Sequence, residues 1–380
     1  MDNIHLKESE TGKGFRDILK IAVVLMLIYL FLVSIKMMGL SFKLFGRGFA
    51  ESLINSTTNR FVGLFIGILA TSIIQSSSTV TSIVVGMVGG GMLTITNAIP
   101  IIMGANIGTS VTNTLVSMGH INRKDEFKRA FHGAILHDHF NFLSVMVLFP
   151  LELAFGPLQW IAAKSSKYVM RIDWISHEGA FAYCIGLPSK MLKGFLISDV
   201  GLSKTTAGAL ILSLSLIILI FGLTMIVRVM KSMMLERIES FFDKYIFKYA
   251  VLSLFLGLLL TALVQSSSVT TSLVVPLMGA GILNPNQVFP YMIGANIGTT
   301  VTAMLAAVAT CSQAAIIVAL VHFFFNLFGA VIWYPFKKVP LKLSNWICNF
   351  VLVKRRYAIG YIVFMFFILP ALLIFFSRFF

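Results

Sequence analysis

The feature that most constrains this chain is an internal repeat within two long apolar stretches. A shift of 190 residues lays residues 65–119 onto residues 255–309 without a gap, with roughly 25 of about 55 positions identical. The segment LATSIIQSSSTVTSIVV falls on LLTALVQSSSVTTSLVV, and MGANIGTSVT falls on IGANIGTTVT. Further on, His137 and Asn141 match His322 and Asn326 once a short insertion is allowed. We therefore expect two structurally related halves.

Composition places both halves in a lipid bilayer. Hydrophobic residues make up 57% of the chain and charged residues only 12%, so a soluble enzyme is excluded. Two stretches, residues 61–118 and 249–309, are apolar but broken by Gly, Ser, Thr, Asn and Pro, which predicts interrupted helices. The fold class expected is an all-α integral membrane protein whose two inverted-topology repeats carry broken or re-entrant helices, as hairpins, at the membrane midplane. Uninterrupted apolar runs long enough to span a bilayer lie at residues 18–39, 130–151, 208–229, 314–334 and 357–376.

The charges of the loops predict how the halves are oriented. Residues 122–129 read NRKDEFKR, whereas the equivalent loop at residues 311–313 has no charge. Positive residues favour the cytoplasmic side, so the first loop is expected inside and the second outside, which inverts the repeats. The chain carries 30 Lys and Arg against 15 Asp and Glu, but membrane topology accounts for this excess. Because no basic stretch carries interleaved aromatics, we predict no nucleic-acid partner.

These patterns divide the chain into five segments. Cys184, Cys311 and Cys348 are too far apart to indicate a disulfide framework or a thiolate metal site. The first apolar run lacks a cleavage site and is expected to be a retained helix. The expected segments are a cytoplasmic tail (1–17), transmembrane repeat 1 (18–152), an extracellular linker (153–205), transmembrane repeat 2 (206–336), and a basic loop with a final transmembrane segment (337–380).

Two clusters of polar side chains interrupt otherwise lipid-compatible runs. An unpaired polar group in hydrocarbon costs several kcal/mol, so such clusters persist where they pack internally or meet a polar ligand. Serines and threonines also serve close helix packing, which is the alternative. Recurrence of the same four residues in both repeats favours a binding site. The clusters are Gln75, Ser76, Ser77 and Ser78, and Gln265, Ser266, Ser267 and Ser268.

A second repeated element is GANIGT, at residues 104–109 and 294–299. Glycines four residues apart can serve close helix packing. However, Pro100 and Pro290 precede the two segments, and each holds an Asn and a Thr, which favours an unwound helix beside a buried cavity. We therefore expect Asn106 and Asn296 to face a ligand.

The repeated polar clusters contain no fixed positive charge, because residues 61–118 and 249–309 have no Lys or Arg. An anion held there must be bound by hydroxyls, amides and helix N-termini, together with co-bound cations. The same oxygens are suitable ligands for Na⁺. The pattern therefore predicts sodium-coupled anion transport, with Na⁺ as the coupling ion and no other cofactor.

Asp138 is the only acidic residue well inside a predicted span. Acids inside membranes are generally functional, and the equivalent position in the second half is Phe323, so symmetry does not explain it. Helical spacing places Asn141 beside it. The alternative is a structural pairing with His137 or His139. Adjacent positions on a helix cannot grip one ion together, so this run does not indicate a metalloenzyme.

The two QSSS segments, GANIGTSVTNT with GANIGTTVTA, and HDHFNFLSVMVLFPLE resemble the type II sodium-dependent phosphate cotransporter family over roughly residues 63–333. The resemblance implies a secondary transporter that takes up inorganic phosphate with Na⁺, by alternating access between inverted repeats. The linker is short compared with that of animal relatives and holds a single cysteine, which is expected of a bacterial minimal form.

The resemblance also implies roles for individual residues. It places an additional sodium ion at Asp138 with Asn141, which makes transport electrogenic with three Na⁺ per divalent phosphate. The phosphate candidates are Ser76, Ser77, Ser78, Ser266, Ser267, Ser268, Asn106 and Asn296. The other sodium candidates are Gln265, Ser266, Thr299 and Thr302, with Gln75, Thr109 and Thr112 as their counterparts in the first repeat.

Two other classes share part of this evidence. A sodium-coupled transporter of another oxyanion, such as sulfate, would show every feature described above. A membrane-embedded enzyme would need a nucleophile, base or metal set, which the sequence does not offer, so we expect no enzymatic activity. The expected partners are inorganic phosphate, Na⁺ and membrane lipids, in the plasma membrane or bacterial inner membrane. The oligomeric state stays open, with a homodimer among the options.

Overall fold

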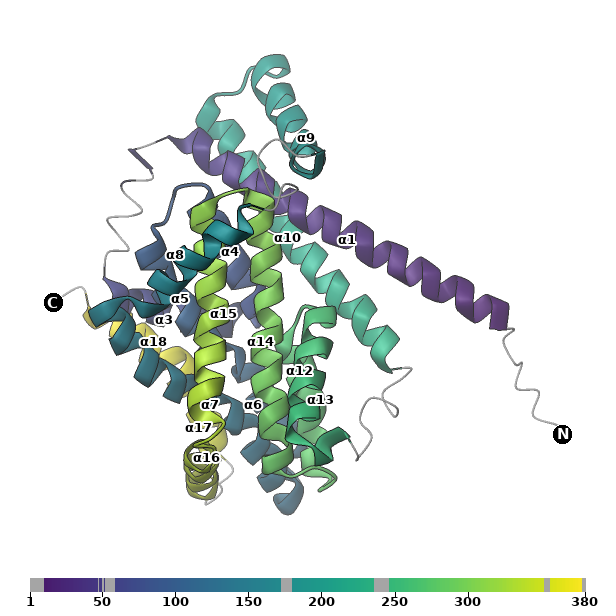
Figure 1. Cartoon of the computed structure of the whole chain (residues 1–380), viewed down its shortest axis with the longest axis vertical. Coiled ribbons are helices and arrows are strands. Elements are labelled where there is room, and N and C mark those ends of the chain that lie inside the picture. Colours follow the sequence, from purple (N-terminus) through teal and green to yellow (C-terminus); the bar gives the residue numbers. More distant parts are fainter. Residues whose placement is uncertain are drawn as a thin grey trace.

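The structure is a computed structural model that describes residues 10–46, 48–49, 51, 59–171, 180–235, 246–351 and 356–377. These residues form helices joined by short turns, and no strand occurs among them (Figure 1). Residues 1–9 of the predicted N-terminal tail lie outside the described part, and its remainder begins the first helix. The all-helical fold predicted from the sequence is confirmed.

Seven helices in the described part are long and apolar enough to cross a membrane. Each of the five uninterrupted runs predicted from the sequence lies in one of them, so those predictions are confirmed. The two additional helices come from the interrupted stretches. The seven span Ile18–Phe45, Ile95–His120, Lys124–Phe155, Lys204–Met233, Pro285–Thr310, Gln313–Trp333 and Arg356–Phe376.

The two halves have the same order of helices. In each, a long helix precedes a hairpin of two shorter helices, and two further helices follow it. In the first half these are α1 (Glu10–Phe45), α3 (Arg60–Ile74), α4 (Ser77–Gly89), α5 (Ile95–Thr109) with α6 (Val111–Ser117) and η1 (Met118–His120), and α7 (Lys124–Phe155). In the second they are α10 (Lys204–Leu235), η4 (Ile246–Lys248), α12 (Ala250–Val264), α13 (Ser267–Gly279), α14 (Pro285–Thr310) and α15 (Gln313–Trp333).

The open ends of the two hairpins lie at opposite ends of the molecule. Gly89, where α4 ends, lies against Thr310 at the end of α14. Gly279, where α13 ends, lies against His120 and accepts a hydrogen bond from Arg129 at the start of α7. Figure 1 shows α4 and α13 near opposite ends of the upright helices α14 and α15. The hairpins enter the molecule from opposite sides, as expected for inverted repeats.

The GANIGT segments are helical in both halves, so the predicted unwinding is wrong. Residues 104–109 lie within α5 and residues 294–299 lie within α14. Their glycines allow two helix backbones to touch. A Cβ added to Gly104 would lie 1.9 Å from the carbonyl oxygen of Leu64, and one added to Gly294 would lie 1.9 Å from that of Leu254. Close packing of α3 with α5 and of α12 with α14 therefore explains this motif.

Further helices surround the two repeats. Within the predicted linker, α8 begins where the buried carboxylate of Glu152 accepts hydrogen bonds from two backbone amides, the N–H of Leu158 at 2.7 Å and that of Gln159 at 3.1 Å. Residues 172–179 of that linker and residues 352–355 of the predicted basic loop lie outside the described residues. The additional helices are α8 (Pro157–Val169), α9 (Ala180–Gly194), η3 (Phe195–Asp199), α16 (Lys338–Val351), α17 (Arg356–Val363), η5 (Phe364–Ile368) and α18 (Leu369–Phe376).

Candidate functional site

The QSSS segments form the tips of the two hairpins. Gln75 ends α3 with φ of 60°, and Gln265 ends α12 with φ of 61°, both in the left-handed region. A residue with a side chain is strained in that region by about 1–2 kcal/mol, so a surrounding structure must hold it there. The next residues, Ser76 and Ser266, are extended and cap the second helix of each hairpin. The predicted breaks therefore occur at QSSS in both repeats.

A threonine holds the glutamine side chain of each tip. The Thr112 hydroxyl donates to Oε1 of Gln75 at 2.9 Å, and the Thr302 hydroxyl donates to Oε1 of Gln265 at 2.8 Å. The amide nitrogen of each glutamine donates to a backbone carbonyl at the end of its own helix. The structure thus brings together two pairs of sodium candidates that the sequence places 37 residues apart.

The serines of the two tips differ in the hydrogen bonds that they make. The hydroxyl oxygens of Ser76 and Ser266 accept the backbone N–H of Thr79 and Val269, so they are helix caps. Ser78 donates to the backbone carbonyl of Gln265 at 2.9 Å, which joins the two tips directly. Three serine side chains make no hydrogen bond to the described residues, although all three are buried; these are Ser77, Ser267 and Ser268.

Thr109 and Thr299 hold equivalent positions in α5 and α14. Each hydroxyl donates to the carbonyl four residues earlier, that of Ala105 at 2.8 Å and that of Ala295 at 3.0 Å. Their oxygen lone pairs are not used by these bonds, so both threonines keep an acceptor. The repeat symmetry of the site extends to these side chains.

Asn296 joins the two repeats through its side chain. Its Oδ1 lies 2.7 Å from Nε2 of His137, and its Nδ2 donates to Oδ1 of Asn141 at 2.7 Å. All three residues are buried. Asn296, a phosphate candidate of the second repeat, is therefore hydrogen-bonded to His137 and Asn141 on α7 of the first repeat.

Asn106 contacts the equivalent histidine and asparagine of the second repeat, but it accepts the hydrogen bond from the asparagine instead of donating it. Its Oδ1 lies 3.4 Å from Nε2 of His322 and accepts from Nδ2 of Asn326 at 3.3 Å. The backbone carbonyl of Asn106 accepts from Asn141 at 2.8 Å, so the two networks touch. Sequence reasoning identified the histidines only as repeated positions. The structure adds that each histidine bonds to the asparagine of the other repeat, His137 to Asn296 and His322 to Asn106.

Asp138 lies at the edge of this network and has different partners from those expected. Its Oδ2 accepts from the Tyr361 hydroxyl at 3.2 Å and from the Thr114 hydroxyl at 3.4 Å. His137 bonds to Asn296, and His139 donates from Nδ1 to the carbonyl of Ile135 in its own helix, so the histidine pairing considered from the sequence is wrong.

The other carboxylate oxygen of Asp138 is buried and has no partner among the described residues. Asp138 borders a cavity of about 180 Å³, which Phe142, Ile347, Tyr361 and Met365 line with apolar or aromatic surface. A buried carboxylate with one free oxygen is suited to holding a cation or a proton. The predicted neighbour Asn141 bonds to Asn106 and Asn296 instead.

Comparison with known proteins shows which family this chain belongs to. The Na⁺/Pi-cotransporter family matches residues 30–171 and 218–346, which include both hairpins and all the residues of the two tips. The chain belongs to this family. The resemblance noted in the sequence is thereby confirmed, and the chain is a multi-pass membrane protein.

The relatives of this Na⁺/Pi-cotransporter family member include proteins from mammals. Sodium-dependent phosphate transport protein 2A of Ovis aries is 33% identical over 429 residues, which cover 93% of this chain and 67% of the relative. Sodium-dependent phosphate transport protein 2B of Homo sapiens is 31% identical over 447 residues, which cover 94% of this chain and 65% of the relative. The chain thus spans about two thirds of the length of these relatives. No solved structure matches it.

The family match ends at residue 346, before α17 and its Tyr361. The hydroxyl that bonds to Asp138 therefore comes from outside both the repeats and the matched ranges. No repeat or motif in the sequence marks Tyr361, which explains why sequence reasoning missed it. Thr114 was missed for a related reason, because its counterpart in the second repeat is Met304.

Asn113 is another buried residue that breaks the symmetry of this cotransporter. Its Nδ2 lies 3.0 Å from Nδ1 of His137, and its Oδ1 accepts from the Thr271 hydroxyl at 2.9 Å. The counterpart of Asn113 is Ala303, and Nδ1 of His322 has no partner among the described residues. The first repeat therefore holds its histidine more firmly than the second does.

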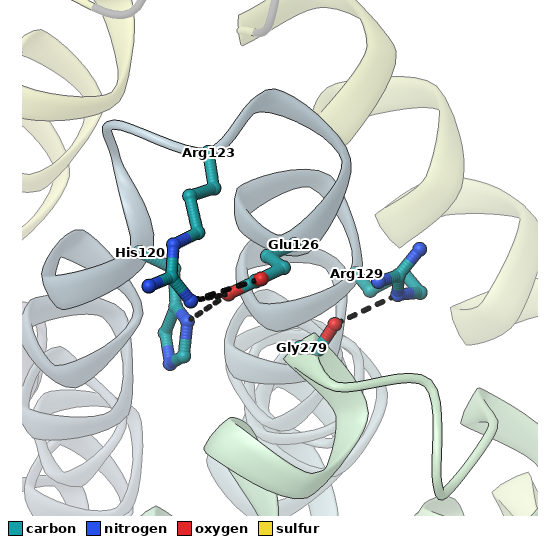
Figure 2. A network of polar contacts seen from close by, with 5 residues as sticks. All are labelled: His120, Arg123, Glu126, Arg129 and Gly279. Atoms are coloured by element: carbon teal, nitrogen blue, oxygen red, sulfur yellow. Dashed lines mark hydrogen bonds and ion pairs between the residues drawn. The ribbon is translucent and has the colours of Figure 1, made fainter.

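Charged residues hold the open end of the second hairpin (Figure 2). Arg129 donates from Nε to the carbonyl of Gly279 at 2.8 Å, at the negative end of α13. Nearby, Glu126 accepts from Arg123 at 3.1 Å and lies 3.3 Å from Nδ1 of His120. The loop predicted to be cytoplasmic thus anchors the open end of the α12–α13 hairpin, while the tip of that hairpin faces the centre of the molecule.

Proposed function

We propose that this chain is a secondary active transporter that uses Na⁺ to take up inorganic phosphate across the plasma membrane, which in a bacterium is the inner membrane. The observation that carries this proposal is the pair of hairpin tips, each with a threonine-held glutamine and buried serines. Family membership supports the class of transport, and the names of the relatives support the substrate and the coupling ion.

Phosphate is proposed to bind between the two tips. The hydroxyls of Ser77, Ser267 and Ser268 are buried and have no partner among the described residues, so each can donate to a phosphate oxygen. The N-termini of α4 and α13 also lie at the tips, where the helix dipoles favour an anion. Entry of phosphate would replace the bond from Ser78 to the carbonyl of Gln265.

Sodium is proposed to bind at the paired glutamine and threonine oxygens. Oε1 of Gln265 and Oγ1 of Thr302 lie 2.8 Å apart, and the side chains of Ser266 and Thr299 supply further oxygens in the same half. Gln75, Thr112 and Thr109 repeat this set in the first half. These ions supply the positive charge that the tips themselves lack.

A third sodium ion is proposed to bind at the free oxygen of Asp138. A divalent phosphate moving with two Na⁺ carries no net charge, whereas a third Na⁺ makes each cycle carry one positive charge inward. A carboxylate is suited to hold that ion, because an ion without a counter-charge in the membrane is costly. Asp138 is thus the proposed origin of electrogenic transport.

Access to this site is proposed to alternate between the two sides of the membrane. The hairpins enter from opposite sides, and their tips meet through the bond between Ser78 and Gln265. Movement of one hairpin away from the centre would open the site to one side only. The contact of Arg129 with Gly279 would then keep the α12–α13 hairpin in place, so that the side from which this hairpin enters stays closed.

Substitution of two tip residues tests this assignment by separating the two ligands. Thr302→Val removes a proposed sodium ligand, so the Na⁺ concentration for half-maximal uptake should rise about tenfold. Ser267→Ala should instead raise the phosphate concentration for half-maximal uptake by roughly ten- to a hundredfold, since a hydrogen bond to a charged ligand is worth about 1.5–3 kcal/mol.

Thr300→Val is the matched control for these measurements. Thr300 lies on the same helix as Thr302 and is also buried, but its hydroxyl donates to the carbonyl of Ile297 in its own helix at 2.7 Å. Uptake of 32P-labelled phosphate into proteoliposomes should therefore keep its ordinary Na⁺ dependence in this variant. If Thr302→Val and Thr300→Val behaved alike, the proposed sodium site would be wrong.

A further inference from the structure

Lys36 lies within an apolar membrane span and has no carboxylate partner in the described residues. It belongs to α1, whose span runs from Ile18 to Phe45. The partner that the structure records for its ammonium group is the sulfur of Cys311, at 3.4 Å. A thiol is a weak acceptor and supplies no countercharge. An ionisable side chain in a span is costly unless it is paired, so a partner for Lys36 is expected.

Lys36 opens onto a pocket that two more lysines share. The pocket has a volume of about 120 Å³ and lies where α1 and α9 meet the ends of α4 and α14. Lys43 and Lys190 line it together with Lys36, and none of its described lining residues is acidic. Ser189 and Thr310 also line it, and their hydroxyls donate to backbone carbonyls of their own helices. Three lysines thus border one hollow, whose other surface is largely apolar.

The positions of these lysines follow from the helices that carry them. Lys36 and Lys43 are seven residues apart on α1, which places them on one face of that helix. Lys190 approaches from α9. Between them, Gly186 leaves space, because a Cβ added there would lie 3.8 Å from Cε of Lys36. A hollow of this volume accommodates a tetrahedral oxyanion, since a water molecule takes up about 30 Å³ in the liquid.

We propose that this lysine pocket, formed by Lys36, Lys43 and Lys190, is a second phosphate-group site, separate from the hairpin tips. Lysine ammonium groups bind phosphate as compact point charges. The ligand carries its phosphate group either as free inorganic phosphate or as the headgroup of an anionic phospholipid. The site goes beyond the proposed transport function, because none of its lining residues belongs to a QSSS segment.

The site is tested by binding measurements on the full chain in nanodiscs without Na⁺. In choline buffer, 32P-labelled phosphate binding reports on the lysine pocket, because the tip site is proposed to require Na⁺. In a second arm, native mass spectrometry compares retention of phosphatidylglycerol with that of phosphatidylcholine. The test variant is K36Q/K43Q/K190Q, and the control with an equal loss of charge is K124Q/K338Q/K342Q, which changes exposed lysines of α7 and α16.

The proposal expects K36Q/K43Q/K190Q to lose binding about tenfold or more in one arm, while K124Q/K338Q/K342Q keeps it. Loss in the first arm identifies free phosphate, and loss in the second identifies a lipid headgroup. Gly186→Leu fills the pocket without changing its charge and should give the same loss. If both pocket variants bound phosphate and phosphatidylglycerol as the unaltered chain does, the proposal would be overturned.

Discussion

Replacing Gly294 with alanine should destabilise the second repeat strongly. The added Cβ would lie 1.9 Å from the carbonyl oxygen of Leu254, whereas ordinary contacts begin near 3.4 Å. The difference is about 1.5 Å, and α12 and α14 must separate by that amount because a helix backbone cannot rotate away. Overpacking of this kind costs about 1–3 kcal/mol, and rigid backbone on both sides places this case at the upper end. The apparent melting temperature should fall by about 4 °C, since a chain of 380 residues has an unfolding entropy of about 0.8 kcal/mol/K.

Gly222→Ala in α10 is the matched control. The nearest atom to its added Cβ lies 3.6 Å away, which is an ordinary contact, and alanine favours a helix over glycine by about 1 kcal/mol. Thermal unfolding of both purified variants, followed by intrinsic fluorescence, should show Gly294→Ala unfolding earlier and Gly222→Ala unchanged or later. Equal melting temperatures would refute the close crossing of α12 and α14, and with it the packing explanation of GANIGT.

Two further predictions concern charge movement and orientation. Asp138→Gly should keep Na⁺-dependent phosphate uptake but abolish its current, and Tyr361→Phe should raise the Na⁺ requirement of that current, since it removes the hydrogen bond to the carboxylate. The charge moved per phosphate is measured by electrophysiology on supported membranes. If this charge were undiminished in the glycine variant, the role of Asp138 would be structural. Single cysteines placed at Gly119 and at Thr310 should react with impermeant maleimide from the cytoplasm and from outside respectively. Labelling of both from the same face would contradict inverted repeats.

The repeat made the tips predictable from the sequence. Four polar residues recur within apolar stretches, and no helix can cross hydrocarbon with such a cluster unless it packs internally. The pairing of Gln265 with Thr302 follows from the same recurrence, because each has a counterpart 190 residues earlier. When both repeats keep the same side chains, the recurrence alone is enough to predict which side chains form the site.

The remaining features depend on contacts that symmetry does not encode. The predicted unwinding of GANIGT was wrong because glycine is compatible both with an unwound backbone and with close packing of two helices. Only the position of the Leu254 carbonyl distinguishes the two. Asp138 was correctly singled out as asymmetric, but its partner Tyr361 lies 223 residues away in a helix that belongs to neither repeat. Lys36 likewise meets Cys311 only through tertiary packing.

The most direct test of the account is phosphate accumulation by the purified chain alone. Proteoliposomes are given 32P-labelled phosphate with an inward gradient of Na⁺, or with K⁺ or choline at the same concentration, at a clamped inside-negative potential. Because the potential acts on the net charge of the cycle, worth about 2.3 kcal/mol per 100 mV and unit charge, it should accelerate the Na⁺-driven uptake. We expect accumulation with Na⁺ only, and little inhibition by excess sulfate. Equal uptake with choline, or accumulation of labelled sulfate in place of phosphate, would contradict it.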